Sequence, residues 1–453
     1  MVVSPLEYRY GREEVKLIFD EDSRLKYLLK IEVAIAQAQS EQNLIPREAF
    51  IEIQNAVNSG KVKLERIKEI EKETRHDMMA LIRSLTEVSG SGGKYVHFGV
   101  TSNDILDTAT ALQLRDFTHF LIEDLIELQG ELLKKVEEHI HSVMLGRTHG
   151  QHASPITFGL KMAVYLAEVN RHIQRVMQGR ERYIAGKILG PVGTGASLGE
   201  AALEIQDRVM EILGIRAETA STQVVDRDRI IEFLSIVNNI VTTLEKISTE
   251  IRNLQRSEID EVSEYFDMEK QVGSSAMPNK VNPVNSENIG SLSRFIRSLI
   301  ISEYEAAITW HERDLTNSAS ERFVIPYASI LTDYVLKKMS NVISTLIVKK
   351  ERMLENLIAD PLVMGENIVS TLTEHGVPRQ DAHEMVRTSS MEVYRTGKPF
   401  KETLISNGIL KYLSEAELQR TLNPEDFTGK SEKICLNVIE SSKLLLQEVY
   451  RGI

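Results

Sequence analysis

The sequence contains only one cysteine, Cys435, among its 453 residues. A single thiol cannot form an intramolecular disulfide or a zinc site built on several thiolates, and it is typical of a reducing compartment. The sequence also lacks the ~20-residue apolar stretch of a membrane span and the apolar run of a secretory signal. We therefore expect a cytoplasmic protein with no membrane partner.

Basic residues are in the minority, because 54 Lys and Arg face 66 Asp and Glu, for a formal net charge of −12. Proteins that bind nucleic acid do so largely through an excess of positive charge on the phosphates. The acidic balance therefore argues against a nucleic-acid partner. It still permits a small basic pocket for a single phosphate group.

Prolines are also scarce, 11 in all, and no alternating apolar pattern typical of a β-sheet is evident. Apolar residues instead recur every three or four positions, which places them on one stripe of a helix. The clearest stripe consists of Ile230, Phe233, Val237, Ile240, Leu244, Ile247, Ile251 and Leu254. Similar stripes cover residues 117–136, 289–302 and 327–346. We predict an all-α protein with a central bundle of long helices.

Turn-forming residues separate the helical stretches and suggest where the chain divides. We predict an N-terminal helical domain at 1–103, a central helical-bundle domain at 104–350 and a C-terminal helical domain at 351–453. The glycine-rich stretch at 190–199 lacks the preceding strand and the spacing of a dinucleotide-binding loop, and no P-loop motif is present. Histidine and carboxylate spacings give no convincing metal site.

The most informative segment reads GSSAMPNKVNP and covers residues 273–283. A glycine, two serines and two prolines form a loop with defined turns, while Lys280 and Asn282 offer a cation and an amide donor. These groups suit a substrate that carries a carboxylate. Composition alone equally fits a solvated loop between two helices.

The same segment matches the GSSxMPxKxNP signature of the fumarase/aspartase superfamily of lyases, which the chain resembles over nearly its whole length. Further motifs follow in the superfamily's order: TRHD at 74–77, HFGVTSND at 97–104, GRTHG at 146–150, STQ at 221–223 and WHERD at 310–314. Within the superfamily these motifs look most like the adenylosuccinate lyases. The resemblance implies a three-domain all-α fold and a homotetramer in which three subunits contribute to each active site.

The resemblance also implies a reaction, a β-elimination that releases fumarate from a succinyl nucleotide. Adenylosuccinate would give AMP, and succinyl-aminoimidazole-carboxamide ribotide would be cleaved in the same way in purine biosynthesis. Such a carbon–nitrogen lyase needs a base, an acid and fixed donors for the charge that develops on a carboxylate. No metal and no organic cofactor are implied.

Catalytic roles follow from the resemblance, residue by residue. Ser274 matches the general base and His149 the general acid, while Glu287 matches the carboxylate that orients the acid. Lys280 matches a residue that stabilises charge on the substrate carboxylate, and His76 a second active-site histidine. The resemblance places His76, His149 and Ser274 of one active site on different chains.

Binding roles are carried over in the same way. The positions that match contacts to the succinyl carboxylates are Thr101, Ser102, Thr148, Gln223 and Asn282, and Asp77 matches a further substrate contact. The positions that match the phosphate site are Arg9, Tyr10, Arg313, Ser318 and Arg322. Several arginines around one phosphate would form charge-assisted hydrogen bonds, whereas each arginine alone could equally form a surface salt bridge.

Two other interpretations stay open. Asn279 replaces a histidine that is common in adenylosuccinate lyases, and Pro191 replaces an alanine, so another member such as an argininosuccinate lyase or a carboxymuconate cycloisomerase is an alternative. A catalytically silent structural helical protein is the third interpretation, because a fold does not fix a function.

Overall fold

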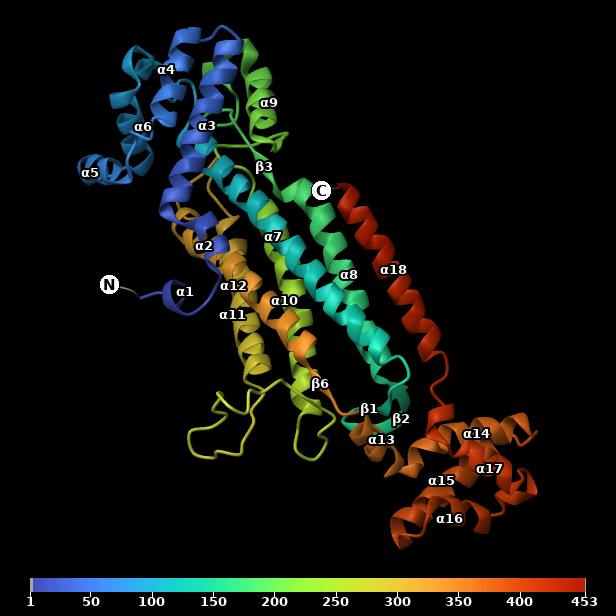
Figure 1. Ribbon diagram of the computed structural model, residues 1–453. Helices are drawn as coiled ribbons and strands as arrows, with labels where there is room; N and C mark the ends of the chain where they lie inside the picture. Colours follow the sequence, from blue (N-terminus) through green and yellow to red (C-terminus); the bar gives the residue numbers. More distant parts are fainter. Residues whose placement is uncertain (1–2, 453) are drawn as a thin grey trace. The chain divides into compact units, whose positions relative to one another are not determined.

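The computed structural model describes residues 3–452, which are mostly helical, and the predicted all-α class is confirmed (Figure 1). Its contacts divide the chain into two compact units. Unit 1 comprises the residues through Leu125, His172–Thr242 and Ser291–Lys337, and unit 2 comprises Ile126–Arg171, Thr243–Gly290 and the residues from Lys338 onward. The division into three domains stays a prediction. No helix within residues 3–452 combines the length and the apolar character needed to cross a bilayer.

Five long helices contribute segments to both units, and Figure 1 shows their lengthwise course. They are α7 (Ser102–Glu138), α8 (Phe158–Tyr183), α10 (Asp228–Leu254), α11 (Val284–Ala306) and α12 (Ser318–Thr345). All eight residues of the stripe predicted at 230–254 are buried, because α10 presents them on one face. On α11 the predicted stripe is only half right: Ile289 and Ile296 are buried, whereas Leu292 and Leu299 are partly exposed.

Unit 1 contains the short N-terminal helices and two small parallel strands. Its elements are α1 (Pro5–Tyr8), α2 (Glu13–Phe19), α3 (Glu21–Glu41), α4 (Arg47–Asn58), α5 (Leu64–Thr74), α6 (Asp77–Val88), η1 (Gly90–Tyr95), β3 (Ala185–Gly186), η2 (Ala196–Ala201), α9 (Ala202–Leu213) and β4 (Arg216–Ala217). Helix α3 packs against α4 and α9, and α5 packs against α6. A cluster of buried aliphatic residues from these helices and the start of α7 forms the core.

Unit 2 contains the C-terminal helices and two antiparallel strand pairs. Its elements are β1 (Val143–Thr148), β2 (Gln151–Thr157), β5 (Val262–Ser263), β6 (Ile347–Val348), α13 (Lys350–Ile358), η3 (Pro361–Met364), α14 (Gly365–Glu374), α15 (Arg379–Thr396), α16 (Phe400–Ser406), η4 (Ile409–Lys411), α17 (Glu415–Thr421), η5 (Pro424–Asp426) and α18 (Ser431–Gly452). Cys435 is a buried free thiol on α18. The β1–β2 hairpin was not predicted, because its sequence gives no regular alternation of apolar and polar residues.

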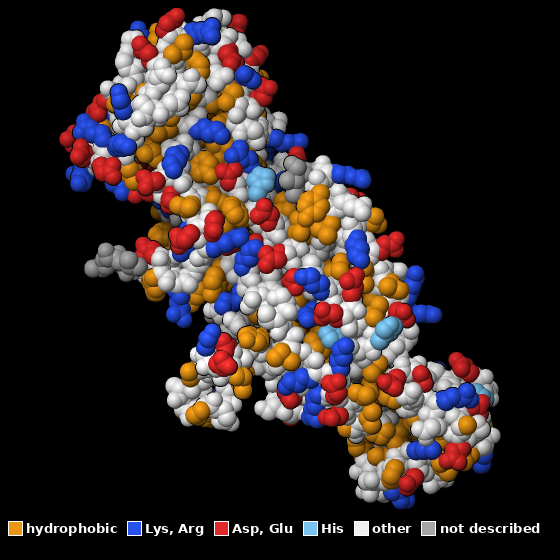
Figure 2. Space-filling model, in the orientation of Figure 1, with side chains coloured by type: hydrophobic (Ala, Val, Ile, Leu, Met, Phe, Trp, Pro, Cys, Tyr) orange, Lys and Arg blue, Asp and Glu red, His pale blue; other side chains and the backbone are white. Residues whose placement is uncertain are grey.

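Charged side chains of both signs are intermixed over the face that Figure 2 shows. Blue and red side chains often lie next to one another there. Any binding site for an anion has to be built locally, from side chains that converge in a pocket.

Candidate active site

The residues predicted for the site divide between the two units. Unit 1 holds Arg9, Tyr10, His76, Asp77, Thr101, Ser102, Gln223, Arg313, Ser318 and Arg322, and unit 2 holds Thr148, His149, Ser274, Lys280, Asn282 and Glu287. The first group consists of predicted substrate contacts and one histidine. The second group contains the predicted base and acid.

A cavity of about 460 Å³ in unit 1 brings four of the predicted residues together. Asp77, Arg313, Ser318 and Arg322 line it, from the start of α6, the segment before α12 and the first turns of α12. Apolar side chains from α3, α5 and α6 complete the wall. A polar cluster beside an apolar wall is the usual composition of a small-molecule site.

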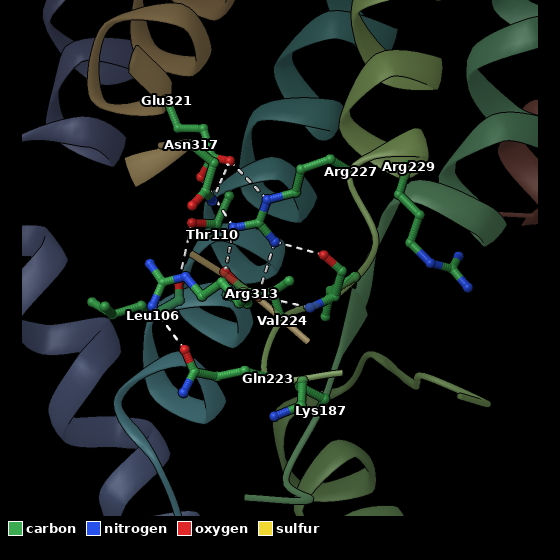
Figure 3. A network of polar contacts seen from close by, with 12 residues as sticks. Leu106, Thr110, Lys187, Gln223, Val224, Arg227, Arg229, Arg313, Asn317 and Glu321 are labelled. Atoms are coloured by element: carbon green, nitrogen blue, oxygen red, sulfur yellow. Dashed lines mark hydrogen bonds and ion pairs between the residues drawn. The ribbon is translucent and has the colours of Figure 1, made fainter. Parts of the chain in front are cut away.

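Arg313 is held at this cavity by neutral amides. Its Nη1 donates to Gln223 Oε1 at 3.0 Å, and Figure 3 shows the two side chains pointing toward each other. The Asn103 amide, oriented with its oxygen toward Arg313, accepts a second hydrogen bond at 2.8 Å. Burial lowers the pKa of Arg313, although Asp107 opposes the shift. Since arginine stays protonated, the lowered pKa expresses the cost of keeping its charge in this place.

Arg227 lines the same cavity but is neutralised by two carboxylates. Its Nη1 and Nη2 each donate to Asp107 at 3.0 Å. Its Nε donates to Glu321 at 2.7 Å, and both of these side chains are labelled in Figure 3. Burial lowers the pKa of Arg227, but Asp107 and Glu321 outweigh burial and raise it overall. A buried and fully paired arginine of this kind braces the wall and has no charge left for a ligand.

Thr101 and Ser102, at the start of α7, lie beside a buried ion pair. Asp104 and Lys187 are both fully buried and contact each other. Asp104 also accepts hydrogen bonds from Thr101 N at 2.8 Å and Gly190 N at 3.0 Å. One carboxylate therefore ties the start of α7 to the glycine-rich stretch after β3, and thereby fixes Thr101.

His76 and Asp77 lie at the sharp link between α5 and α6. His76 is the exposed N-cap of α6, and its Nδ1 accepts weakly from Met79 N at 3.4 Å. Asp77 accepts from Arg322 Nη2 at 3.2 Å, which joins α6 to α12 at the cavity. The structure therefore brings Asp77 to the predicted phosphate group but leaves His76 outside the cavity lining.

The N-terminal pair Arg9 and Tyr10 does not line the cavity. Arg9 is exposed and lies over the Tyr10 ring, 5.9 Å from its centre, and Tyr10 packs edge-on against Tyr334 with ring centres 5.4 Å apart. Arg12 anchors the segment, because it contacts the buried carboxylates of Asp333 and Asp124. The structure thus attaches this segment to the middle of α12.

In unit 2, His149 lies at the tip of the β1–β2 hairpin. Arg147 pairs with His152 and Thr148 with Gln151, so His149 and Gly150 form a two-residue turn. Both turn residues have positive φ, 54° and 73°, as a type I′ turn requires. Thr148 and His149 are exposed at this tip, where an acid can meet a substrate.

A bidentate ion pair fixes the base of this hairpin. Arg147 Nη1 and Nη2 donate to the two carboxylate oxygens of Glu261 at 3.0 and 2.7 Å. Glu261 is fully buried, and Asn356 Nδ2 donates to its Oε1 at 2.9 Å. Because Glu261 directly precedes β5, the pair joins the hairpin of His149 to the strand that leads into residues 264–283.

Residues 264–283, which we term the signature segment, carry Ser274, Lys280 and Asn282. Asn282 Nδ2 donates to Gly273 O at 3.0 Å, and a Cβ on Gly273 would lie 2.0 Å from Lys280 O. Only glycine permits the backbone at residue 273 to approach the backbone at Lys280 this closely. Ser274 Oγ accepts from Met277 N at 3.2 Å and from Ala276 N at 3.4 Å.

Glu287 lies in the exposed first turn of α11. The buried Glu264 caps this helix, since it accepts from Ser286 N at 2.7 Å and from Asn285 N at 3.1 Å. Within the described part of the chain, no hydrogen bond joins Glu287 to His149. The predicted orientation of the acid by Glu287 therefore stays a prediction.

Two family models match this chain. The model described as "Lyase" covers residues 7–297, and the model described as "Adenylosuccinate lyase C-terminus" covers residues 361–438. The chain is 44% identical to the adenylosuccinate lyase of Methanothermobacter thermautotrophicus over 446 aligned residues. These residues cover 98% of this chain and 99% of the relative. It is 46% identical over 442 residues to that of Pyrococcus horikoshii, covering 97% and 98%. The chain belongs to the adenylosuccinate lyase family.

Solved structures of the wider superfamily share its fold. A fumarate lyase from Mesorhizobium sp. BNC1 superposes with a TM-score of 0.88 at 27% identity, covering 95% of this chain and 98% of that one. The 3-carboxy-cis,cis-muconate lactonizing enzyme of Pseudomonas putida gives 0.88 at 26% identity, covering 98% and 100%. The family, the fumarase-like fold and the class of carbon–nitrogen lyase predicted from the sequence are confirmed.

Sequence reasoning missed several residues that build this adenylosuccinate lyase-family site. Asn103, Asp104 and Arg147 lie inside motifs that carried the resemblance, so their position was a usable signal. Arg227, Asp107 and Glu321 gave none, because an ion pair between residues 94 to 120 positions apart has no local pattern.

Proposed function

We propose that this chain catalyses the β-elimination of fumarate from adenylosuccinate to give AMP, and from succinyl-aminoimidazole-carboxamide ribotide in purine biosynthesis. The observation that favours these substrates over others of the superfamily is the cavity lined by Arg313, Ser318 and Arg322. Argininosuccinate and carboxymuconate carry no phosphate and do not require such a pocket. A nucleotide phosphate does, because its charge needs several donors in an otherwise acidic protein.

Ser274 is the base in this proposal, and it removes the proton next to a succinyl carboxylate. A serine hydroxyl serves as a base only when its oxyanion is stabilised. The N–H groups of Ala276 and Met277, which already point at Ser274 Oγ, support that role, because hydrogen bonds to the charged form favour it. Lys280 and Asn282 then hold the carboxylate on which negative charge develops.

His149 is the acid that protonates the leaving nitrogen as the carbon–nitrogen bond breaks. Histidine suits this step because its unperturbed pKa of about 6.5 lies near physiological pH. The exposed hairpin tip supports this assignment, and Glu287 and His76 complete the catalytic set. Thr101, Ser102, Thr148 and Gln223 bind the succinyl carboxylates in this proposal. Arg9 and Tyr10 are assigned to the phosphate by the resemblance alone, since they do not line the unit 1 cavity.

The direct test is the release of fumarate from adenylosuccinate, with AMP identified as the second product and Ser274→Ala as the control. Formation of both products by the wild type alone is the expected result. Fumarate from argininosuccinate instead, or lactonisation of carboxymuconate, would replace the substrate assignment. Absence of any product from correctly assembled protein would favour the silent structural protein.

The active form is proposed to be a homotetramer with shared sites, and a cytoplasmic location remains a prediction. The resemblance to the superfamily, in which three subunits contribute to each active site, is what supports shared sites. Inactive Ser274→Ala and His149→Ala proteins should then regain part of the activity when they are mixed and reassembled. Proven subunit exchange without recovery would contradict the shared site.

A further inference from the structure

Arg24 on α3 lines the unit 1 cavity together with Arg313 and Arg322, although no motif contains it. Its Nη1 donates to Gln113 Oε1 at 3.0 Å, and Gln113 Nε2 in turn donates to Ile18 O at 2.8 Å. The amide is thus fixed by the backbone and holds the guanidinium in one orientation. Within residues 3–452, no carboxylate lies at ion-pair distance from Arg24.

The carboxylates around this cavity are mostly engaged elsewhere. Asp107 and Glu321 neutralise Arg227, Asp77 contacts Arg322, and Glu21 contacts Lys68 at 2.5 Å. The remaining one, Glu71, is exposed at the rim. Arg24 and Arg313 are therefore the two cations of the lining that neutral amides hold in place.

The energetic cost of keeping Arg24 charged in this place appears in its pKa. Burial lowers its pKa, and the neighbouring Arg322 lowers it further, against the weaker influence of Asp77 and Asp107. Two like charges next to a cavity repel each other, and a partly buried cation without a counter-ion is destabilising. An anion bound in the cavity removes both costs.

We propose that Arg24 is a further substrate-binding residue of this site, which together with Arg313 binds the phosphate of the succinyl nucleotide. The inference rests on the proposed function and extends it by one residue. A phosphate suits two amide-held arginines because it offers three acceptor oxygens and up to two negative charges. A succinyl carboxylate shares the chemistry of an anion, and the test separates the two sources.

The test is calorimetric titration of AMP into the assembled protein, with KM and kcat for adenylosuccinate measured in parallel. Arg24→Met should raise the Kd of AMP and the KM about 10- to 100-fold, as expected for loss of a hydrogen bond to a charged group. Its kcat should stay within a few-fold. Arg24→Lys should recover part of the loss. Arg66→Met, which removes two exposed ion pairs, with Glu69 on α5 and Glu87 on α6, should bind like the wild type.

Inorganic phosphate and fumarate, used as competing inhibitors, distinguish the anions. Weaker inhibition by phosphate with unchanged inhibition by fumarate in Arg24→Met is expected, and the reverse would overturn the assignment. Wild-type affinity for AMP in a folded Arg24→Met protein would overturn it as well. If that variant fails to assemble, Arg24→Gln, which keeps a donor near Gln113 without the charge, must show the same loss. Failure of the proposed function looks different, because the wild type itself would then neither bind AMP nor release fumarate.

Discussion

The unit 1 cavity and the signature segment of unit 2 are built in opposite ways. Buried ion pairs and amide hydrogen bonds fix the cavity, as with Arg227 between Asp107 and Glu321. The signature segment is held mainly by hydrogen bonds between its own side chains and backbone, and many of its side chains are open, with Met268 82% and Val272 80% exposed. The proposed binding groups are thus preorganised, whereas the proposed base lies on a segment that can adjust.

The largest expected effect is on the signature segment. Ser274→Ala should lower kcat about 10²- to 10⁴-fold, because general-base catalysis contributes that much, and should leave KM within a few-fold. The melting temperature should not change, since the segment adds little to the core. Ser275→Ala is the matched control, because Ser275 is the exposed neighbour. Near-normal kcat in Ser274→Ala, or an equal loss in Ser275→Ala, would contradict the assignment of the base.

Substitution of a residue in the cavity wall should lower the stability of the protein. Arg227→Met leaves the buried Asp107 and the partly buried Glu321 without their partner, and should lower the free energy of unfolding by ~3–5 kcal/mol. Urea unfolding measures this, with Arg66→Met, whose ion pairs are exposed, as a control that should change little. A wild-type midpoint for Arg227→Met would show that the wall does not depend on this ion pair.

Arg313 should behave unlike Arg227, although both line one cavity. Arg313→Met leaves no buried carboxylate without an ion-pair partner, so the stability should be nearly unchanged. The KM for adenylosuccinate should rise about 10- to 100-fold. Steady-state kinetics and a melting curve on the same preparation separate the two effects. Loss of stability without a change in KM would make Arg313 a structural residue.

The smallest expected effect concerns Glu303 on α11, whose pKa is raised to about 8 by burial and by the nearby Glu321. An unfolded carboxyl group titrates near 4.5, so Glu303 costs the wild type stability as pH rises from ~4.5 to ~8, and Glu303→Gln lacks this contribution. The free energy of unfolding of the variant, relative to that of the wild type, should therefore rise by at least ~1 kcal/mol between pH 5 and 8 and stay level above pH 8. A difference in melting temperature that is constant with pH would contradict the buried neutral carboxyl.

Much of the fold could be predicted from local sequence. The stripe on α10 is buried as predicted, because helical periodicity is a property of neighbouring residues. The burial predicted for the stripe on α11 was partly wrong, because periodicity identifies the apolar face of a helix but not the element that packs against it. The β1–β2 hairpin was missed because its bulge between Leu145 and Arg147 interrupts the alternation.

The motifs identified the residues of the predicted site, but not the contacts that support these residues. The order of the motifs led to Ser274, His149 and Arg313, whose roles stay predictions. Arg24 had no signal, because its significance depends on the absence of a carboxylate partner in three dimensions. Counting charges along a sequence cannot reveal which of them are neutralised.

The most direct test of the separation between binding and chemistry is calorimetric titration of AMP into three proteins: the wild type, Ser274→Ala and Arg313→Met. Ser274→Ala should bind AMP with wild-type affinity although it does not turn over, and Arg313→Met should bind about 10- to 100-fold more weakly. Unchanged binding by Arg313→Met, together with lost binding by Ser274→Ala, would contradict the account.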